Sequence, residues 1–118
     1  MNFMNAEKSK YKNKKIEADG RIYDSKKEYK RALELQEMES KGIITNLQYQ
    51  VEFELQPSFK INGKTIRAIK YLADFVYTQD GIDIVEDVKA SKFFTTDVYK
   101  LKKKMFEFKY GIEIKEIY

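Results

Sequence analysis

The chain has 118 residues, the size of one domain, and it can bury a hydrophobic core without covalent cross-links. It contains no cysteine and no histidine, which excludes disulfides, thiolate metal sites and most zinc, copper and iron centres. Any bound metal must therefore have oxygen ligands, as Mg²⁺ and Mn²⁺ do. No apolar run approaches the length of a membrane span, so we expect a cytoplasmic protein without a membrane partner.

The formal net charge of +4 is concentrated near the N-terminus. Residues 1–15 contain five lysines and one glutamate, whereas the remaining residues have equal numbers of basic and acidic side chains. We expect residues 1–13 to form a basic, flexible tail and residues 14–118 to form a single domain. Such a tail either contacts a nucleic-acid backbone or is a disordered, solubilising leader, and charge alone leaves both alternatives open.

The domain is predicted to begin with a short hairpin over residues 14–23 that turns at Asp19-Gly20. A helix follows over residues 25–40. Ser25 and Glu28 have the spacing of a capping box at its start, and Lys41-Gly42 ends it. The helical spacing predicts a stripe made of Tyr29, Ala32, Leu33 and Gln36, extended by Leu35 and Met38.

Extended segments are predicted next, over residues 43–49 and 51–55, and Pro57 ends them. Asn62-Gly63 predicts a hairpin between residues 59–61 and 64–66. A second hairpin pairs residues 71–77 with 84–89, and after a loop over 90–96 a second helix is expected over residues 97–109.

Thr96 is the candidate N-cap of this second helix, Gly111 its stop, and residues 112–118 alternate as a final strand. The predicted fold class is therefore α/β, with a central mixed sheet flanked by helices and with extra hairpins. The predicted buried stripe of the second helix is Val98, Leu101, Met105 and Phe108.

Two acidic residues face each other across the second hairpin. If Asp80-Gly81 is a two-residue turn, the register sets Asp74 opposite Asp87, with the carboxylates about 5 Å apart. Like charges at this spacing destabilise a sheet, so the pair indicates a cation between them. The neighbours on that face predict that it is turned towards the core: Leu72, Val76 and Val85.

Further residues extend this pair into a candidate phosphodiester site. Lys89 shares the face of Asp87 by strand spacing, where an ammonium group orients water or stabilises charge on a phosphate. The carbonyl of Val88 is a candidate oxygen ligand, and Glu86 faces away and ranks lower. Glu28 is a candidate third acid, although capping alone explains it. Ordinary surface charge is the competing explanation for the hairpin acids.

The whole pattern resembles the PD-(D/E)xK nuclease superfamily. That family has a restriction-endonuclease-like α-β-β-β-α-β core, with an Asp on one central strand and (Asp/Glu)-x-Lys on the next. Residues 11–117 also resemble small phage and prophage proteins of Gram-positive bacteria. The matching stretches are residues 23–28, 53–57, 71–75, 85–89 and 99–104.

The resemblance implies a DNA endonuclease of phage recombination, replication or DNA processing that depends on Mg²⁺ or Mn²⁺. It implies metal binding by Asp74 and Asp87, water positioning by Lys89, and a role for Glu28 as the acid of the first helix. Ala73 stands where the motif's proline is expected, which is a departure from the pattern.

Basic and aromatic residues near the second helix are candidates for contacting DNA. The lysines either bind phosphates or form a solvated helix face. Phe93 and Phe94 either contact nucleic acid, pack against a partner subunit, or anchor the core. A catalytically inactive DNA-binding protein and a protein-interaction module are the alternative functions, and symmetric cutting of two strands would suggest a homodimer. The candidate DNA-binding lysines are Lys100, Lys102, Lys103 and Lys104.

Overall fold

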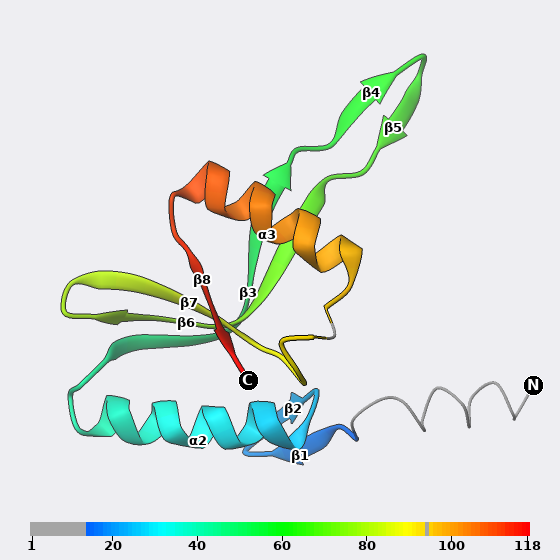
Figure 1. Ribbon diagram of the computed structural model, residues 1–118. Helices are drawn as coiled ribbons and strands as arrows, with labels where there is room; N and C mark the ends of the chain where they lie inside the picture. The colour runs from blue at the N-terminus through cyan, green and yellow to red at the C-terminus, as the bar shows by residue number, and fades with distance from the viewer. Residues whose placement is uncertain (1–13, 94) are drawn as a thin grey trace, which may run out of the picture.

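The computed structural model describes residues 14–93 and 95–118, and Figure 1 shows the arrangement of its elements. The predicted tail and Phe94 lie outside the described residues. The elements in chain order are β1 (Ile16–Ala18), β2 (Arg21–Tyr23), α2 (Lys26–Ser40), β3 (Thr45–Gln56), β4 (Phe59–Ile61), β5 (Lys64–Ile66), β6 (Ile69–Gln79), β7 (Ile82–Val88), α3 (Asp97–Tyr110) and β8 (Ile114–Ile117).

A four-stranded mixed sheet with the order β3-β6-β7-β8 forms the centre of the domain. The β3–β6 and β6–β7 pairs are antiparallel, and β8 lies parallel to β7. Strands β1–β2 and β4–β5 form two separate hairpins. The prediction of a mixed α/β fold with a central mixed sheet and additional hairpins is therefore confirmed. Among the described residues, no helix combines the length and the apolar character needed to cross a membrane.

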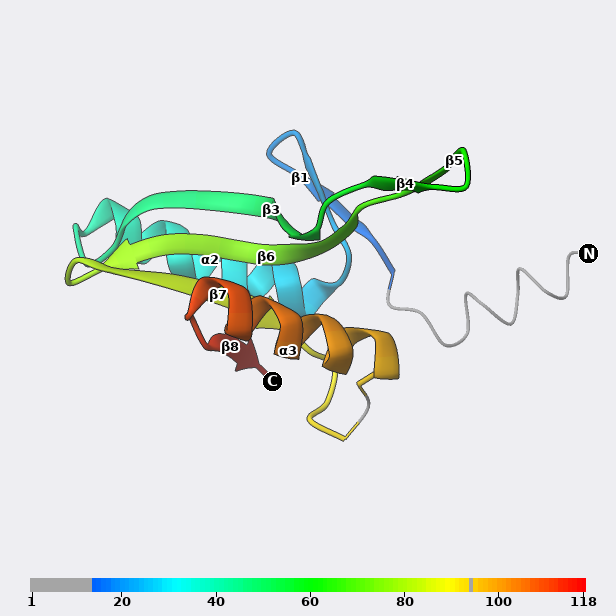
Figure 2. The same cartoon turned by 90° about the horizontal axis from the view of Figure 1, so that it is seen from above.

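The two helices pack on opposite faces of β7, as adjacent residues of that strand show. Val85 belongs to the buried cluster that contains Phe106 of α3, whereas Glu86 bonds to Arg31 of α2. Successive strand residues point to opposite faces, so the sheet separates the helices here. Figures 1 and 2 show α2 and α3 on different sides of the crossing strands.

Strand β6 contributes residues to both buried clusters. Tyr71 and Ala73 belong to the cluster beneath α3, but Phe75 and Tyr77 belong to the cluster beneath α2. In a regular strand these four residues would all share one face. The buried side of the strand therefore changes at Asp74: the buried residues before it pack beneath α3, and those after it pack beneath α2.

Helix α2 begins and ends close to the predicted positions. The Glu28 N–H donates to the side chain of the N-cap Ser25, and Lys41 caps the C-terminus. The chain leaves the helix through Gly42, whose φ of 75° suits glycine. One stripe residue was wrongly predicted, because Leu33 is exposed while Ala32 and Leu35 are buried.

Helix α3 has the predicted caps but a different buried face. Thr96 is its N-cap, and Gly111, with a φ of 68°, follows its last turn. The predicted stripe is right only at Met105, which is partly buried against the core: Phe108 is 92% exposed, and Val98 and Leu101 are also exposed. Phe106 is buried instead, because its ring packs against aromatic rings of β3, β6 and the helix's own last turn. These partners are Phe53, Tyr71 and Tyr110.

Candidate functional site

A cleft of about 710 Å³ opens where the N-terminus of α2, strands β6 and β7 and the first turns of α3 meet. Elements far apart in the sequence therefore contribute polar side chains to one space. The cleft contains all four side chains that the sequence analysis singled out for chemistry. The residues that define the candidate site are Asp24, Glu28, Gln50, Asp74, Asp87 and Lys89.

The register of the β6–β7 hairpin is the one predicted. Gln79 pairs with Ile82, and the pairing continues as far as Phe75 with Glu86. Asp74 is the next residue beyond the last pair, and its Oδ2 accepts a hydrogen bond from the Val88 N–H at 2.7 Å. The Asp74 carboxylate thus binds the opposite strand beside Asp87.

The Asp74 carboxyl has an altered protonation equilibrium. Burial, followed by the charge of Asp87, raises its pKa to about 7, and the hydrogen bond from Val88 only partly offsets these effects. A carboxylate whose ionised form is destabilised by burial and by neighbouring acids is typical of a site that binds a cation or carries out acid–base chemistry.

Asp87 is buried and its carboxylate has two protein partners. It accepts a hydrogen bond from the Tyr71 hydroxyl at 2.6 Å, and the Lys89 Nζ lies 2.8 Å from its Oδ1. The Lys89 ammonium also lies 3.2 Å from the centroid of the Tyr99 ring. Parallel pairing with β8 fixes this segment, because the Lys89 N–H donates to the Ile117 carbonyl at 2.8 Å. The structure therefore brings together the three predicted hairpin residues.

Glu28 lies at the start of α2 with its side chain buried in the cleft. Its backbone N–H donates to the Ser25 hydroxyl, which is half of a capping box. Its carboxylate accepts from the Asp24 N–H at 3.1 Å and from the Gln50 side-chain amide at 2.7 Å. Burial raises its pKa, and the charges of Asp24 and Asp87 raise it further. Glu28 thus both begins the helix and adds an acid to the site.

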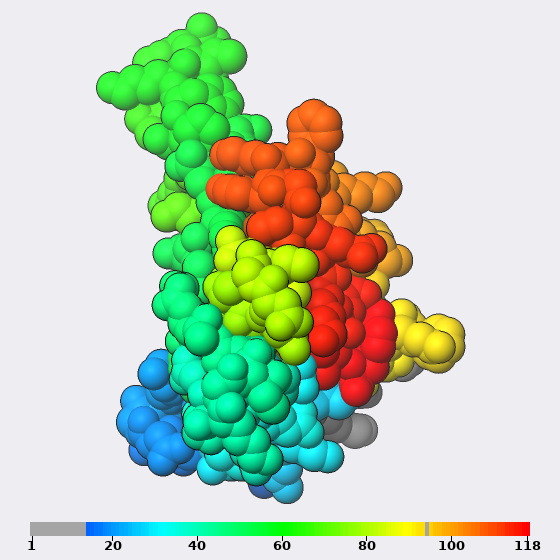
Figure 3. Space-filling model, turned by 90° about the vertical axis from the view of Figure 1, so that its left-hand side faces the viewer, coloured from blue at the N-terminus to red at the C-terminus, as the bar shows by residue number. Residues whose placement is uncertain are grey.

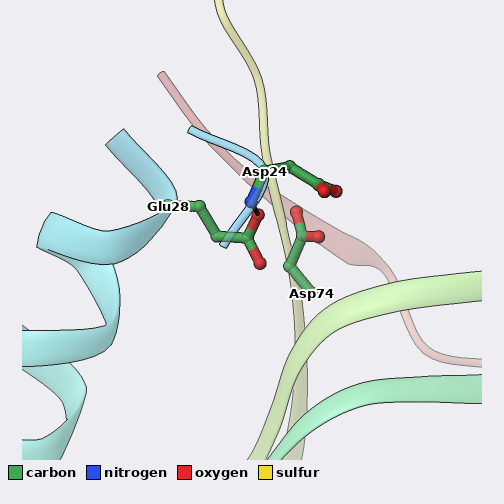
Figure 4. A group of neighbouring side chains, drawn as sticks. All are labelled: Asp24, Glu28 and Asp74. Carbon is green, nitrogen blue, oxygen red and sulfur yellow. Dashed lines mark hydrogen bonds between the residues drawn. The ribbon is translucent and has the colours of Figure 1, made fainter. Parts of the chain in front are cut away.

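An acidic group lies in the cleft, and only its member Asp24 was not predicted from the sequence. One carboxylate oxygen each of Asp24, Glu28 and Asp74 lies within 4.8 Å of the others, and Figure 4 shows the three side chains converging. Asp87 is not part of this group; its carboxylate bonds to Tyr71 and Lys89, while that of Asp24 bonds to Lys15 at 3.0 Å. Only oxygen donors are present, and this donor set fits Mg²⁺ or Mn²⁺.

Gln50 is a second residue that sequence reasoning missed. It interrupts strand β3 with a φ of 51°, between the Tyr49–Phe75 and Val51–Ala73 pairs. Its amide donates to Glu28 and also lies 3.3 Å from Asp74 Oδ1. The only signal in the sequence was the polar break between the two predicted extended segments.

Other candidate residues have different positions. Glu86 faces away from the cleft, as predicted, and binds Arg31 at 2.6 and 2.8 Å and the Tyr77 hydroxyl. Leu72, predicted to face the core, is exposed and lines the cleft. Val88 also lines the cleft, and its N–H binds Asp74.

The four lysines of α3 do not act as one group. Lys102 lines the cleft, whereas Lys103 forms an ion pair with Glu116 at 3.4 Å. Lys100 and Lys104 are exposed. Phe93 is also exposed, so it is not a core anchor.

Fold and site define a mixed α/β protein with a carboxylate-rich cleft that also contains the half-buried Lys89. Comparison with known families places the chain in one of them: residues 8–117 match the family described as "Protein of unknown function (DUF1064)", and the chain belongs to it. No curated protein and no solved structure matches the chain.

Proposed function

We propose that this protein is a metal-dependent DNA endonuclease of the PD-(D/E)xK type. The observation that carries the proposal is the convergence of Asp74, Asp87 and Lys89 with Glu28 in one cleft. The fold supports it, because α2, β3, β6, β7, α3 and β8 follow one another in the α-β-β-β-α-β order. The β1–β2 and β4–β5 hairpins are additions to this core.

In this proposal, Glu28 and Asp74 hold a Mg²⁺ or Mn²⁺ ion together with Asp24 or Asp87. A divalent ion held there would supply positive charge to the scissile phosphate and would make an attacking water more acidic. The raised pKa values of Asp74 and Glu28 support this role, because a divalent cation relieves the repulsion that burial intensifies. The carbonyl of Val88 is a candidate additional oxygen ligand.

Lys89 is proposed to act on the phosphate or on the attacking water. The Asp87 carboxylate and the Tyr99 ring hold its ammonium group at a fixed place in the cleft. A charge held in this way stabilises a developing negative charge without reorganisation during the reaction. Asp87 then serves both to orient Lys89 and to add negative charge beside the metal.

A catalytically inactive, nucleic-acid-binding protein is the second candidate. It is favoured by the bonds of Asp87 to Tyr71 and Lys89, because these two partners satisfy the carboxylate without a metal ion. The two candidates differ in whether binding and turnover require a divalent ion.

A cleavage assay separates them. Linear, nicked, flapped and four-way DNA are incubated with the protein in Mg²⁺, in Mn²⁺ and in EDTA, beside Asp74→Asn and Lys89→Ala variants. Asp83→Asn and Lys92→Ala are matched controls, because both side chains are exposed on the same hairpin or just beyond it. We expect metal-dependent cleavage that falls at least about 100-fold in both site variants and is unchanged in the controls. Folded site variants that cleave as fast as the wild type would refute the nuclease assignment.

A further inference from the structure

The β4–β5 hairpin projects from the body of the protein as an arm. Its two strands pair only with each other and not with the central sheet. All six strand residues are exposed. Figures 1 and 3 show the arm extending past α3, on the continuation of β3 and β6. A two-stranded hairpin without further packing is only marginally stable, so an arm of this kind is well suited to a partner that covers it.

The arm carries positive charge without compensating acids. Residues 57–69 contain Lys60, Lys64 and Arg67 and no aspartate or glutamate, although 36% of the whole chain is charged. Among the ion pairs formed by the described residues, none involves these three side chains. A basic arm with no acidic neighbour attracts a polyanion.

The two faces of the arm differ in character. Residues directly opposite in a hairpin point to the same side, so the Phe59–Ile66 and Ile61–Lys64 pairs share one face. Lys60 and Thr65 form the other face. The apolar side chains are partly exposed: Phe59 is 44% exposed, Ile61 55% and Ile66 38%. The arm thus presents an apolar strip with a basic residue at its tip and a polar, basic back.

We propose that this arm binds double-stranded nucleic acid in a groove, away from the cleft. A two-stranded ribbon fits the major groove of a duplex, where basic side chains reach both phosphate backbones. Apolar side chains contact thymine methyl groups there. The arm therefore has both the charge and the apolar surface that groove binding requires.

A second copy of this chain is a less suitable occupant. The other exposed apolar side chains of comparable size include Leu101 and Phe108 on α3, and these lie among lysines. Contact of the arm with that helix would bring the basic side chains of the arm close to the lysines of α3. A duplex has the opposite charge along its whole length.

The inference rests on the proposed function only in taking nucleic acid as the partner, and its test requires no cleavage. Binding of the full-length protein to a fluorescent 24-base-pair DNA duplex is measured by anisotropy in EDTA over a series of salt concentrations. The charge variant combines Lys60→Ala, Lys64→Ala and Arg67→Ala. Its matched control removes three exposed lysines from α2, its C-cap and β8: Lys30→Ala, Lys41→Ala and Lys115→Ala.

We expect the charge variant to bind the duplex at least about tenfold more weakly. The slope of log affinity against log salt should decrease by up to about 2.7, because each lost phosphate contact removes about 0.9. The control should keep most of the duplex affinity and most of the salt slope. Equal losses in the charge variant and the control would overturn the proposal, because they would show that only overall charge matters.

An apolar variant, Phe59→Thr with Ile61→Thr, tests the groove contact separately. Threonine keeps the strand propensity, so circular dichroism should be unchanged while binding weakens about fivefold at constant salt slope. A dimer in light scattering that this variant converts to a monomer, with duplex affinity unchanged, would overturn the proposal in favour of contact with a second copy. If the wild type does not cleave DNA but its binding to the duplex still depends on the arm, the proposed nuclease function is rejected and the arm's role remains supported.

Discussion

The side-chain amide of Gln50 donates a hydrogen bond to Glu28 Oε2 at 2.7 Å and thereby joins strand β3 to the first turn of α2. The same nitrogen lies 3.3 Å from Asp74 Oδ1 on β6. The backbone reaches this position through a φ of 51°, which costs a residue other than glycine about 1 kcal/mol or more. Strain maintained within a strand beside two acids of raised pKa indicates that Gln50 positions these carboxylates.

A Gln50→Gly substitution should separate stability from function. Glycine adopts a positive φ without strain, but it adds entropy to the unfolded chain and removes the bond to Glu28, so the free energy of unfolding should change by less than about 1 kcal/mol. The Mn²⁺ concentration that gives half-maximal cleavage should rise by about 10- to 100-fold, because the amide no longer orients the carboxylates. Gln48→Ala, an exposed glutamine on the same strand, is the control. A purely structural glutamine would instead lose stability and leave the metal dependence unchanged.

The part of the site fixed by local geometry could be predicted from the sequence. The Asp80-Gly81 turn determines the pairing of β6 and β7, and strand spacing then places Lys89 beside Asp87. Asp24 and Gln50 could not be found in this way. Their positions depend on how the start of α2 packs against β3, which no local spacing specifies.

The identity of the buried face of α3 is testable by paired substitutions. Phe106→Ala should lower the free energy of unfolding by about 3–5 kcal/mol, because it empties a fully buried ring position. Phe108→Ala should change it by less than about 0.5 kcal/mol, because that ring is 92% exposed. Urea denaturation of both variants gives the comparison. Similar losses of stability in the two variants would contradict the burial of Phe106 and the exposure of Phe108.

Helix α3 shows why hydrophobic periodicity alone did not identify its buried face. Val98, Leu101 and Phe108 lie at helical spacing, but so do Tyr99, Phe106 and Tyr110. Both stripes satisfy the same period, and the choice depends on the rings that β3 and β6 present beneath the helix. Caps, in contrast, depend on a few adjacent residues, and Thr96 and Gly111 were predicted correctly.

The buried ion pair between Arg31 and Glu86 should be costly to break from one side. Glu86 is fully buried and binds the guanidinium at two atoms, with the Tyr77 hydroxyl as a third partner. Arg31→Ala leaves the carboxylate without its cation and should lower the free energy of unfolding by about 3 kcal/mol. Arg31→Met with Glu86→Leu should lose much less, because no charge remains buried. Chemical denaturation tests this, and a double variant less stable than Arg31→Ala would contradict it.

Asp74 should lower the stability of the metal-free protein above neutral pH. Its pKa is raised in the folded state from 3.8 to about 7, so the folded state holds the proton more tightly than the unfolded chain does. The associated stability is complete below about pH 4 and is lost as the pH rises through about 7. Asp74→Asn removes this loss, while its amide oxygen can still accept from the Val88 N–H.

We therefore expect Asp74→Asn to be more stable than the wild type by about 1–3 kcal/mol at pH 8 in EDTA, and equally stable at pH 4. Mn²⁺ should narrow or reverse this difference at pH 8: at 100 times its dissociation constant it stabilises the wild type by about 2.7 kcal/mol and the variant much less. Urea denaturation at both pH values, with and without Mn²⁺, measures each quantity. Equal effects of Mn²⁺ on the two proteins would exclude Asp74 as a ligand. A wild type that is the more stable protein at pH 8 in EDTA would show that the Asp74 carboxylate is held by the fold alone and not kept ready for a cation.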